Sequence, residues 1–159
     1  MVNGVGNNKN GGNFMVIKEE RKNLFEVPQG YYIAACITGD YSLGAGVAKQ
    51  LDEHYNMKEK LHHFFPIPSG ERAWYVGNAL LIDNVFNLVD KATRYDKVED
   101  DSLYNALIDM YVQMDEKKVQ KLAIPRLGCG CDGLEWEDVL EMIEEIFDDV
   151  DVEILVCVL

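Results

Sequence analysis

Two glycine-rich segments, each lying between an apolar run and the start of a helical pattern, constrain the fold of this chain most strongly. Residues 38–46 (TGDYSLGAG) follow the apolar run 31–37 (YYIAACI), and residues 126–133 (RLGCGCDG) follow the shorter run 122–124 (LAI). Apolar runs that do not alternate with polar residues are typical of strands buried on both faces. The repeated succession of strand, loop and helix predicts an α/β domain. We expect a three-layer α/β/α arrangement in which a mixed sheet carries helices on both faces.

The remaining apolar patterns supply the other elements of this domain. We expect further strands at residues 14–17, 74–76, 80–82, 85–89 and 153–159, and helices that begin at residues 44–46, 100–102 and about 135. A chain of 159 residues fits one such domain, which we place at residues 14–159. Residues 1–13 contain four Gly and five Asn without apolar periodicity. Because this composition cannot offset the entropy lost on ordering, we expect a flexible tail there.

Charge and composition disfavour several classes of function. The net charge of −13 arises from 15 basic and 28 acidic side chains, which disfavours binding to the phosphates of nucleic acid, although a local basic patch could override it. No apolar run approaches the ~20 residues of a membrane-spanning helix, and the first residues lack the charged-then-apolar order of a secretion signal. We therefore expect no membrane partner and a cytoplasmic location.

The cysteines and histidines do not form a recognisable metal site. Cys129 and Cys131 are one residue apart, and neither a second Cys/His pair nor the three histidines complete the four ligands of structural zinc. We expect neither a metal nor any other cofactor.

Both glycine loops suit a ligand that carries phosphate. In an open α/β sheet, ligands bind at the carboxyl ends of the strands. Glycines there let the main chain approach a phosphate closely, and the helix that follows contributes N–H groups and a positive dipole end. An acidic protein can hold a dianionic pyrophosphate in this way. A Gly-x-Gly pair is also common in tight turns, and neither loop has the Walker sequence or the six-residue dinucleotide fingerprint.

Two charged residues near these loops have both a structural and a chemical interpretation. Asp132-x-x-Glu135 ahead of an apolar helix is a capping box, so Asp132 is predicted to cap that helix and to contribute about 1 kcal/mol. Lys91 follows the strand pattern 85–89, and such a lysine is usually a surface residue. Taken singly, neither residue decides between structure and chemistry.

Taken together, these segments resemble the terminal ADP-ribose protein glycohydrolase branch of the macrodomain family. The phosphate loop and following helix of that branch are similar to residues 125–130 (PRLGCG) followed by Asp132, Leu134, Trp136 and Glu137. Its other loop, its catalytic lysine and its first strand-to-loop turn correspond to residues 43–48 (LGAGVA), residues 88–91 (LVDK) and Leu24-Phe25. The resemblance spans roughly residues 14–159 and is most specific over residues 126–137.

The resemblance implies a macrodomain fold with a pocket for ADP-ribose, in which Lys91 is the nucleophile and Asp132 the acid/base. The residues that it places around ADP-ribose are Asn23, Leu24, Thr38, Leu43, Gly44, Ala45, Gly46, Arg126, Leu127, Gly128, Cys129, Gly130 and Cys131. The family usually carries an aspartate for the adenine amino group where this chain has Asn23, whose side-chain oxygen accepts without a charge. The implied activity is hydrolysis of mono-ADP-ribose from modified acidic side chains, with ADP-ribose and ADP-ribosylated proteins as partners.

Three alternatives would use the same pocket. The domain could be a non-catalytic reader of ADP-ribose, a phosphatase for ADP-ribose 1″-phosphate, or an enzyme that removes ADP-ribose from nucleic acid. The combination of Lys91 and Asp132 favours the hydrolase over the reader. An unperturbed lysine has a pKa near 10.4, so only about one in 2,000 is a free amine at pH 7. A nucleophilic Lys91 therefore needs desolvation or a local base.

Overall fold

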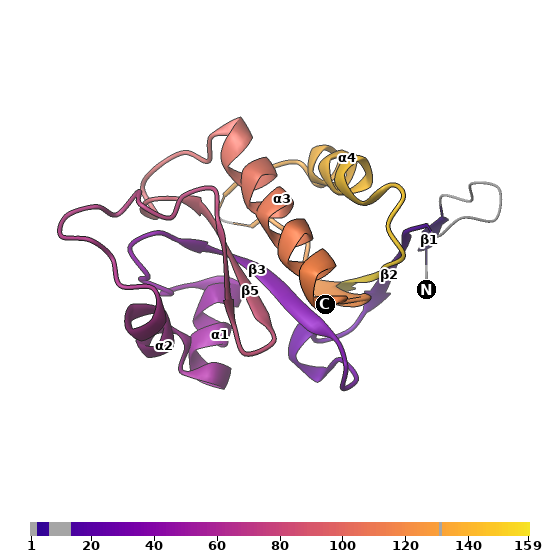
Figure 1. Ribbon diagram of the computed structural model, residues 1–159, viewed down its shortest axis with the longest axis horizontal. Helices are drawn as coiled ribbons and strands as arrows, with labels where there is room; N and C mark the ends of the chain where they lie inside the picture. Colours follow the sequence, from indigo (N-terminus) through magenta and orange to yellow (C-terminus); the bar gives the residue numbers. More distant parts are fainter. Residues whose placement is uncertain (1–2, 7–13, 131) are drawn as a thin grey trace.

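The computed structural model describes residues 3–6, 14–130 and 132–159, which form a seven-stranded mixed sheet with helices on both faces (Figure 1). The strands lie in the order β1-β2-β7-β6-β3-β5-β4. Their bounds are β1 (Asn3–Gly6), β2 (Val16–Arg21), β3 (Tyr32–Thr38), β4 (Ala79–Ile82), β5 (Val85–Lys91), β6 (Lys121–Ile124) and β7 (Glu153–Val158). Strands β2, β7, β6, β3 and β5 run parallel, and the edge strands β1 and β4 pair antiparallel.

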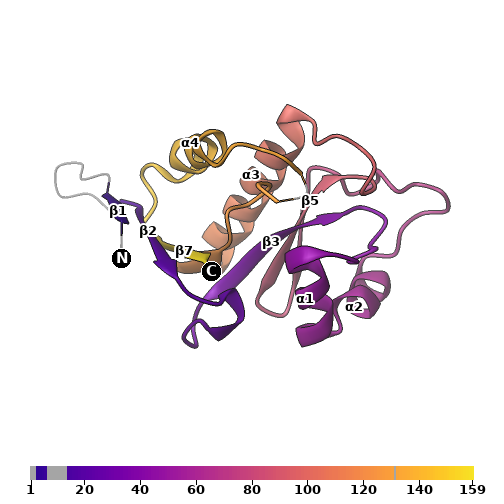
Figure 2. The ribbon, with the colours of Figure 1, turned by 180° about the vertical axis from the view of Figure 1, so that it is seen from behind.

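In the described part of the chain, four helices lie against the two faces of the sheet (Figure 1). Helices α1 (Gly46–Tyr55) and α2 (Met57–Phe64) lie on one face, and α3 (Asp100–Lys117) and α4 (Trp136–Phe147) lie on the other. The view from behind shows the same division (Figure 2). A short 3₁₀ helix, η1 (Leu24–Glu26), follows β2. This arrangement confirms the predicted three-layer α/β/α fold.

Strand β3 explains why the central apolar run does not alternate. Ala34 and the half-buried Cys36 pack into the core beneath α3 and α4, whereas Ile33, Ala35 and Ile37 pack into the core beneath α1 and α2. Because both faces are covered, apolar side chains are favoured at every position along the strand. The predicted strand 31–37 is therefore confirmed within one residue at each end.

The N-terminal segment differs in part from the predicted flexible tail. Residues 3–6 form β1, which pairs antiparallel with residues 16–19 of β2. Pairing with an open sheet edge uses main-chain N–H and C=O groups, so it does not depend on apolar side chains. Residues 1–2 and 7–13 of the predicted tail lie outside the described residues.

One other expectation about the elements is wrong, and one helix was missed. Residues 74–76 were expected in a strand but lie in a series of turns between Gly70 and Gly77, both with positive φ, and the Trp74 side chain is 59% exposed. Helix α2 was not predicted, because its eight residues bury only Met57 and Leu61 and give too short a periodic pattern. The predicted helix starts at residues 44–46, 100–102 and 135 agree with α1, α3 and α4.

The carboxyl ends of β3 and β5 carry an irregularity that matters for the site. Ile37 pairs with Val89 and the next residue, Thr38, pairs with Lys91, so Asp90 is the extra residue of a β-bulge in β5. A bulge interrupts the strict alternation of side chains and is common beside active sites.

Among the described helices, none is long and apolar enough to cross a membrane.

Candidate active site

A cavity of about 410 Å³ opens at the carboxyl ends of the central parallel strands, and both glycine loops contribute to its wall. The sequence-predicted site residues that line it are Thr38, Leu43, Gly44, Ala45, Gly46, Lys91, Arg126, Leu127, Gly128, Gly130 and Asp132. Its volume lies within the range of ligand-binding clefts for small molecules. The fold therefore brings together two loops that are about 80 residues apart in the sequence, as expected for a switch of strand order in an open sheet.

The first loop is held rigidly by buried anchors. Tyr41 and Leu43 adopt left-handed φ values of 56° and 42°, and both side chains are buried. The Tyr41 hydroxyl donates to the main-chain oxygen of Phe65 at 2.9 Å. Left-handed conformations of such residues cost about 1–3 kcal/mol each and persist only where the surrounding packing enforces them. These buried side chains therefore hold the loop in one conformation before a ligand binds. Hydrogen bonds to the Asp40 carboxylate hold it further.

Those hydrogen bonds meet at the carboxylate of Asp40. Its Oδ1 accepts from the Thr38 hydroxyl at 2.6 Å and from the Ser42 main-chain N–H at 3.1 Å. The main-chain N–H groups of Gly39 and Asp40 donate to the oxygens of Lys91 and Ala92 at 2.8 and 2.9 Å. These bonds fasten the loop to the end of β5 and so fix its position relative to Lys91.

The start of α1 offers the cavity a positive helix end. The first turn, from Gly46, lines the cavity, and it contains no acidic residue. The N-cap residue is Ala45, which has no side chain able to accept from the first-turn N–H groups. The first turn of α4, in contrast, carries Glu137 and Asp138, which neutralise its dipole. The α1 terminus is therefore the one suited to a phosphate.

The two glycines of the second loop have different roles. Gly128 has a φ of 73°, and a Cβ there would lie 2.7 Å from Cδ1 of Leu134, so the fold itself requires glycine. Gly130 has an ordinary φ, and a Cβ there would meet no atom of the described residues within 4 Å. Because Gly130 also lines the cavity, a side chain at this position would occupy space that a ligand can use.

Arg126 is oriented by a carboxylate on β2. Its Nε and one terminal nitrogen donate to the two carboxylate oxygens of Glu19 at 2.8 and 2.9 Å. This hydrogen bond lowers the pKa of Glu19. The guanidinium is thus already engaged, and it anchors the start of the second loop to the sheet.

Lys91 and Asp132 form an ion pair within the cavity wall. The Lys91 Nζ lies 2.7 Å from Oδ1 of Asp132, with side-chain exposures of only 6% and 12%. The predicted capping role of Asp132 is wrong: α4 begins at Trp136, and its N-cap residue is Glu135, which makes no side-chain cap bond. The Asp132 carboxylate instead faces the lysine. Because both side chains are desolvated in surroundings of low dielectric, this ion pair is a stronger interaction than the predicted helix cap.

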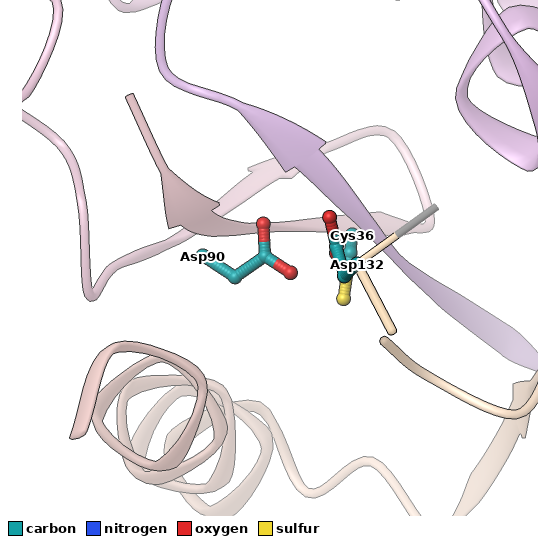
Figure 3. A group of neighbouring side chains, drawn as sticks. All are labelled: Cys36, Asp90 and Asp132. Atoms are coloured by element: carbon teal, nitrogen blue, oxygen red, sulfur yellow. The ribbon is translucent and has the colours of Figure 1, made fainter. Parts of the chain in front are cut away.

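Asp90 is the acidic residue of this site that sequence reasoning missed. It is 1% exposed, and its carboxyl is directed toward Cys36 and Asp132 (Figure 3). Burial, then the hydrogen bond with Asp132 and the charge of Asp132, raise the pKa of Asp90 to about 8. Burial and the same two carboxylates raise the pKa of the Cys36 thiol well above its usual value. A charged residue inside the apolar strand pattern was the available signal.

These three side chains are also the group that could hold a metal ion. The Cys36 thiol and the Asp90 and Asp132 carboxylates place their ligand atoms within 4.8 Å of one another. The set contains one cysteine and no histidine, so the spacing of Cys and His in the sequence does not reveal it. Because the Lys91 ammonium pairs with Asp132, a divalent cation would have to displace or oppose it, and we do not assign these residues as metal ligands.

Three of the predicted residues that the structure describes do not line the cavity. Asn23 precedes η1, where its Oδ1 accepts from the Phe25 main-chain N–H at 2.9 Å, and Leu24 is buried in the core. Cys129 packs against the core beneath α3, and its thiol donates to the Leu127 oxygen. Cys131 lies outside the described residues. Asn23 is thus committed to a local turn, which its short polar side chain favours.

Further residues line the cavity that the sequence did not single out. They are Ala35, Cys36, Ile37, Ser42, Val47, Ala48, Asp90, Arg94 and Pro125. Arg94 adds a third cationic side chain to Lys91 and Arg126 on the wall of this acidic protein. The site thus combines main-chain N–H donors, cationic side chains, and a desolvated amine beside a carboxylate, which are the components of nucleophilic and acid/base chemistry on an anionic ligand.

Comparison with known proteins places these features in context. The Macro domain family model matches residues 36–143. The ADP-ribose glycohydrolase OARD1 of Homo sapiens is 32% identical over 133 residues, which cover 84% of this chain and 85% of that protein. The OARD1 protein of Bos taurus matches with the same identity and coverage.

Solved structures with the same fold have lower sequence identity. The macrodomain of Thermus aquaticus DarG superposes with a TM-score of 0.74 at 22% identity and covers 91% of this chain and 99% of that one. Thermosipho africanus DarTG in complex with ADP-ribose gives a TM-score of 0.67 at 13% identity, and covers 91% of this chain and 41% of that one.

Proposed function

Because this chain belongs to the macrodomain family, we propose that it binds ADP-ribose in the cavity and hydrolyses mono-ADP-ribose from modified acidic side chains of proteins. The observation that carries the proposal is the desolvated pair of Lys91 and Asp132, 2.7 Å apart in the cavity wall. A pocket that only bound ADP-ribose would not need a buried amine beside a carboxylate. The naming of OARD1 as an ADP-ribose glycohydrolase supports the same activity.

We assign the parts of ADP-ribose to the elements that suit them. The pyrophosphate would lie between the α1 N-terminus and the second loop, where the main chain of residues 44–46 and of Gly128 and Gly130 can donate or approach closely. The distal ribose would then reach the end of β5, which carries Lys91. Arg94 adds a positive charge at the same end of the cavity.

The proposed reaction has two steps that balance in protons. The Lys91 ammonium first transfers a proton to Asp132, and its lone pair attacks the anomeric carbon of the distal ribose as the bond to the acyl oxygen breaks. Asp132 returns the proton to the departing acyl oxygen. Asp132 then takes a proton from the water that attacks the lysine–sugar adduct at the same carbon, the carbon–nitrogen bond breaks, and Asp132 passes that proton to the amine, which restores the Lys91 ammonium. The products are ADP-ribose and the free carboxylic acid.

The binding half of the proposal predicts a clear ligand preference. ADP-ribose should bind in the micromolar range, about −8 kcal/mol, whereas AMP should bind at least tenfold more weakly because it lacks the distal ribose and one phosphate. Isothermal titration calorimetry at pH 7 measures both affinities. Equal affinity for the two ligands, or no heat with ADP-ribose, would show that the cavity is not a specific binding site for ADP-ribose.

A further inference from the structure

Beyond the two catalytic groups, we propose that Asp90 is a positioning residue that remains a neutral carboxylic acid and donates its hydrogen bond to Asp132, holding that carboxylate toward Lys91. The inference deepens the proposed function and rests on it. It assigns to this chain a triad of Asp90, Lys91 and Asp132 in which one proton is shared between the two carboxyl groups.

The bulge in β5 makes this triad possible. In a regular strand Asp90 and Lys91 would point to opposite faces of the sheet. Because Asp90 is the extra residue between the Val89 and Lys91 pairings, the alternation is interrupted there. Both successive side chains then lie close to Asp132. The Lys91 Nζ is 2.7 Å from Oδ1 of Asp132, and the Asp90 carboxyl group also contacts the Asp132 carboxylate.

The surroundings of Asp90 require that it carry the proton. Its side chain is fully buried, and its Oδ2 has no hydrogen-bond partner among the described residues. An ionised carboxylate in that position would be a buried charge with an unsatisfied oxygen, next to a second carboxylate. A protonated Asp90 removes the buried charge, and its O–H group can donate to the carboxylate of Asp132, as in two close carboxyl groups that share one proton.

The groups that face Asp90 agree with this state. They are the carboxylate of Asp132 from the second loop, the thiol of Cys36 from β3 and the ammonium of Lys91 from β5 itself. The Lys91 charge is already paired with Asp132, so it does not compensate a second carboxylate fully. Burial together with Asp132 outweighs the two neighbours that favour ionisation, and the pKa of Asp90 is raised to about 8.

A neutral Asp90 limits the negative charge beside the nucleophile. With one carboxylate present, the Lys91 proton can pass to Asp132. When Asp90 ionises as pH rises through about 8, two carboxylates stabilise the Lys91 ammonium and repel the pyrophosphate. Turnover should therefore fall at alkaline pH, where an ordinary lysine nucleophile would become more active.

The test compares the pH dependence of the wild-type protein with that of Asp90→Asn, whose amide keeps a neutral donor at every pH. For the wild type, kcat/KM at pH 9 should be about tenfold below its value at pH 7, because one unit above the pKa only about one tenth of the acid stays neutral. For Asp90→Asn, the same ratio should not fall. Asp83→Asn is the matched substitution: Asp83 lies in the turn between β4 and β5, in an exposed pair with Lys60. This variant should keep the wild-type fall.

A second measurement needs no substrate and applies even if Asp90→Asn does not fold. Carbon-13 NMR of the carboxyl groups should show Asp90 of the wild type titrating near pH 8. Asp90 titrating near its ordinary value of 4, identical kcat/KM profiles for wild type and Asp90→Asn, or stoichiometric binding of Zn²⁺ that Asp90→Asn abolishes would each overturn the proposal. Failure of the wild type to bind or release ADP-ribose at any pH would refute the proposed function, and the NMR titration would still decide the state of Asp90.

Discussion

Replacing Lys91 with alanine should abolish release of ADP-ribose, with kcat lowered by at least about 10³-fold, because the amine that attacks the anomeric carbon is removed. The fold should persist, since the ion pair with Asp132 lies in the cavity wall and only one long side chain is lost. ADP-ribose should still bind, because the glycine loops and the α1 terminus remain. Single-turnover kinetics and calorimetry on the same preparation measure both quantities.

Lys91→Arg is the matched control for charge. Arginine keeps a positive charge for Asp132 but stays protonated at any working pH and cannot act as a nucleophile. It should bind ADP-ribose and release none, like Lys91→Ala. If Lys91→Arg retains wild-type turnover, the lysine acts only through its charge and water attacks the substrate directly.

Asp132→Ala supplies the complementary observation in the same experiment. Lys91 remains as a nucleophile and the acyl group can depart as a carboxylate, but the water that resolves the adduct loses its base. A lysine adduct should therefore accumulate and raise the intact mass by one ADP-ribosyl group. Since Asp132 does not cap α4, any loss of stability should come from the broken pair with Lys91, and the helix content measured by circular dichroism should not change.

Introducing valine at Gly130 should lower ADP-ribose affinity by at least about 100-fold, which corresponds to about 2.7 kcal/mol, without unfolding the domain. Gly130 lines the cavity, and a Cβ at this position meets no atom of the described residues within 4 Å. The added methyl groups would therefore displace ligand rather than protein. Calorimetry gives the affinity, and thermal unfolding tests the fold.

Gly128→Ala is the control that separates a structural glycine from a binding one. The Cβ of the new alanine would lie 2.7 Å from Leu134, and its backbone would have to adopt a φ of 73°. The free energy of unfolding should therefore fall by about 1–3 kcal/mol. Should Gly130→Val fold and bind ADP-ribose as the wild type does, the assignment of the pyrophosphate to the second loop is wrong.

Much of the architecture could be predicted because it depends on local pattern. The apolar run of β3 reflects burial on both faces, and the acidic start of α3 and the apolar stripe of α4 give recognisable helices. The same reasoning wrongly predicted a strand at residues 74–76, because an aromatic, apolar triplet is typical of a strand. Its flanking glycines instead turn the chain, which leaves Trp74 exposed.

The site could be predicted only where its residues follow a loop or strand pattern. The glycine loops and Lys91 fall at the carboxyl ends of strands, where ligands bind in such sheets. Asp132 fitted a capping box equally well, and only the tertiary contact with Lys91, 41 positions earlier in the chain, decides its role. The position of the Asp90 side chain in the site depends on a bulge in β5. That bulge is set by the pairing between β3 and β5, and no local pattern in β5 reveals it.

The most direct test of the hydrolase assignment follows free ADP-ribose released from a peptide that carries a single ADP-ribosylated glutamate. The wild-type protein should release it with multiple turnovers at pH 7, and Lys91→Arg should bind the peptide and release none. A wild-type protein that binds ADP-ribose in calorimetry yet releases none from this peptide would contradict the assignment and identify the domain as a reader.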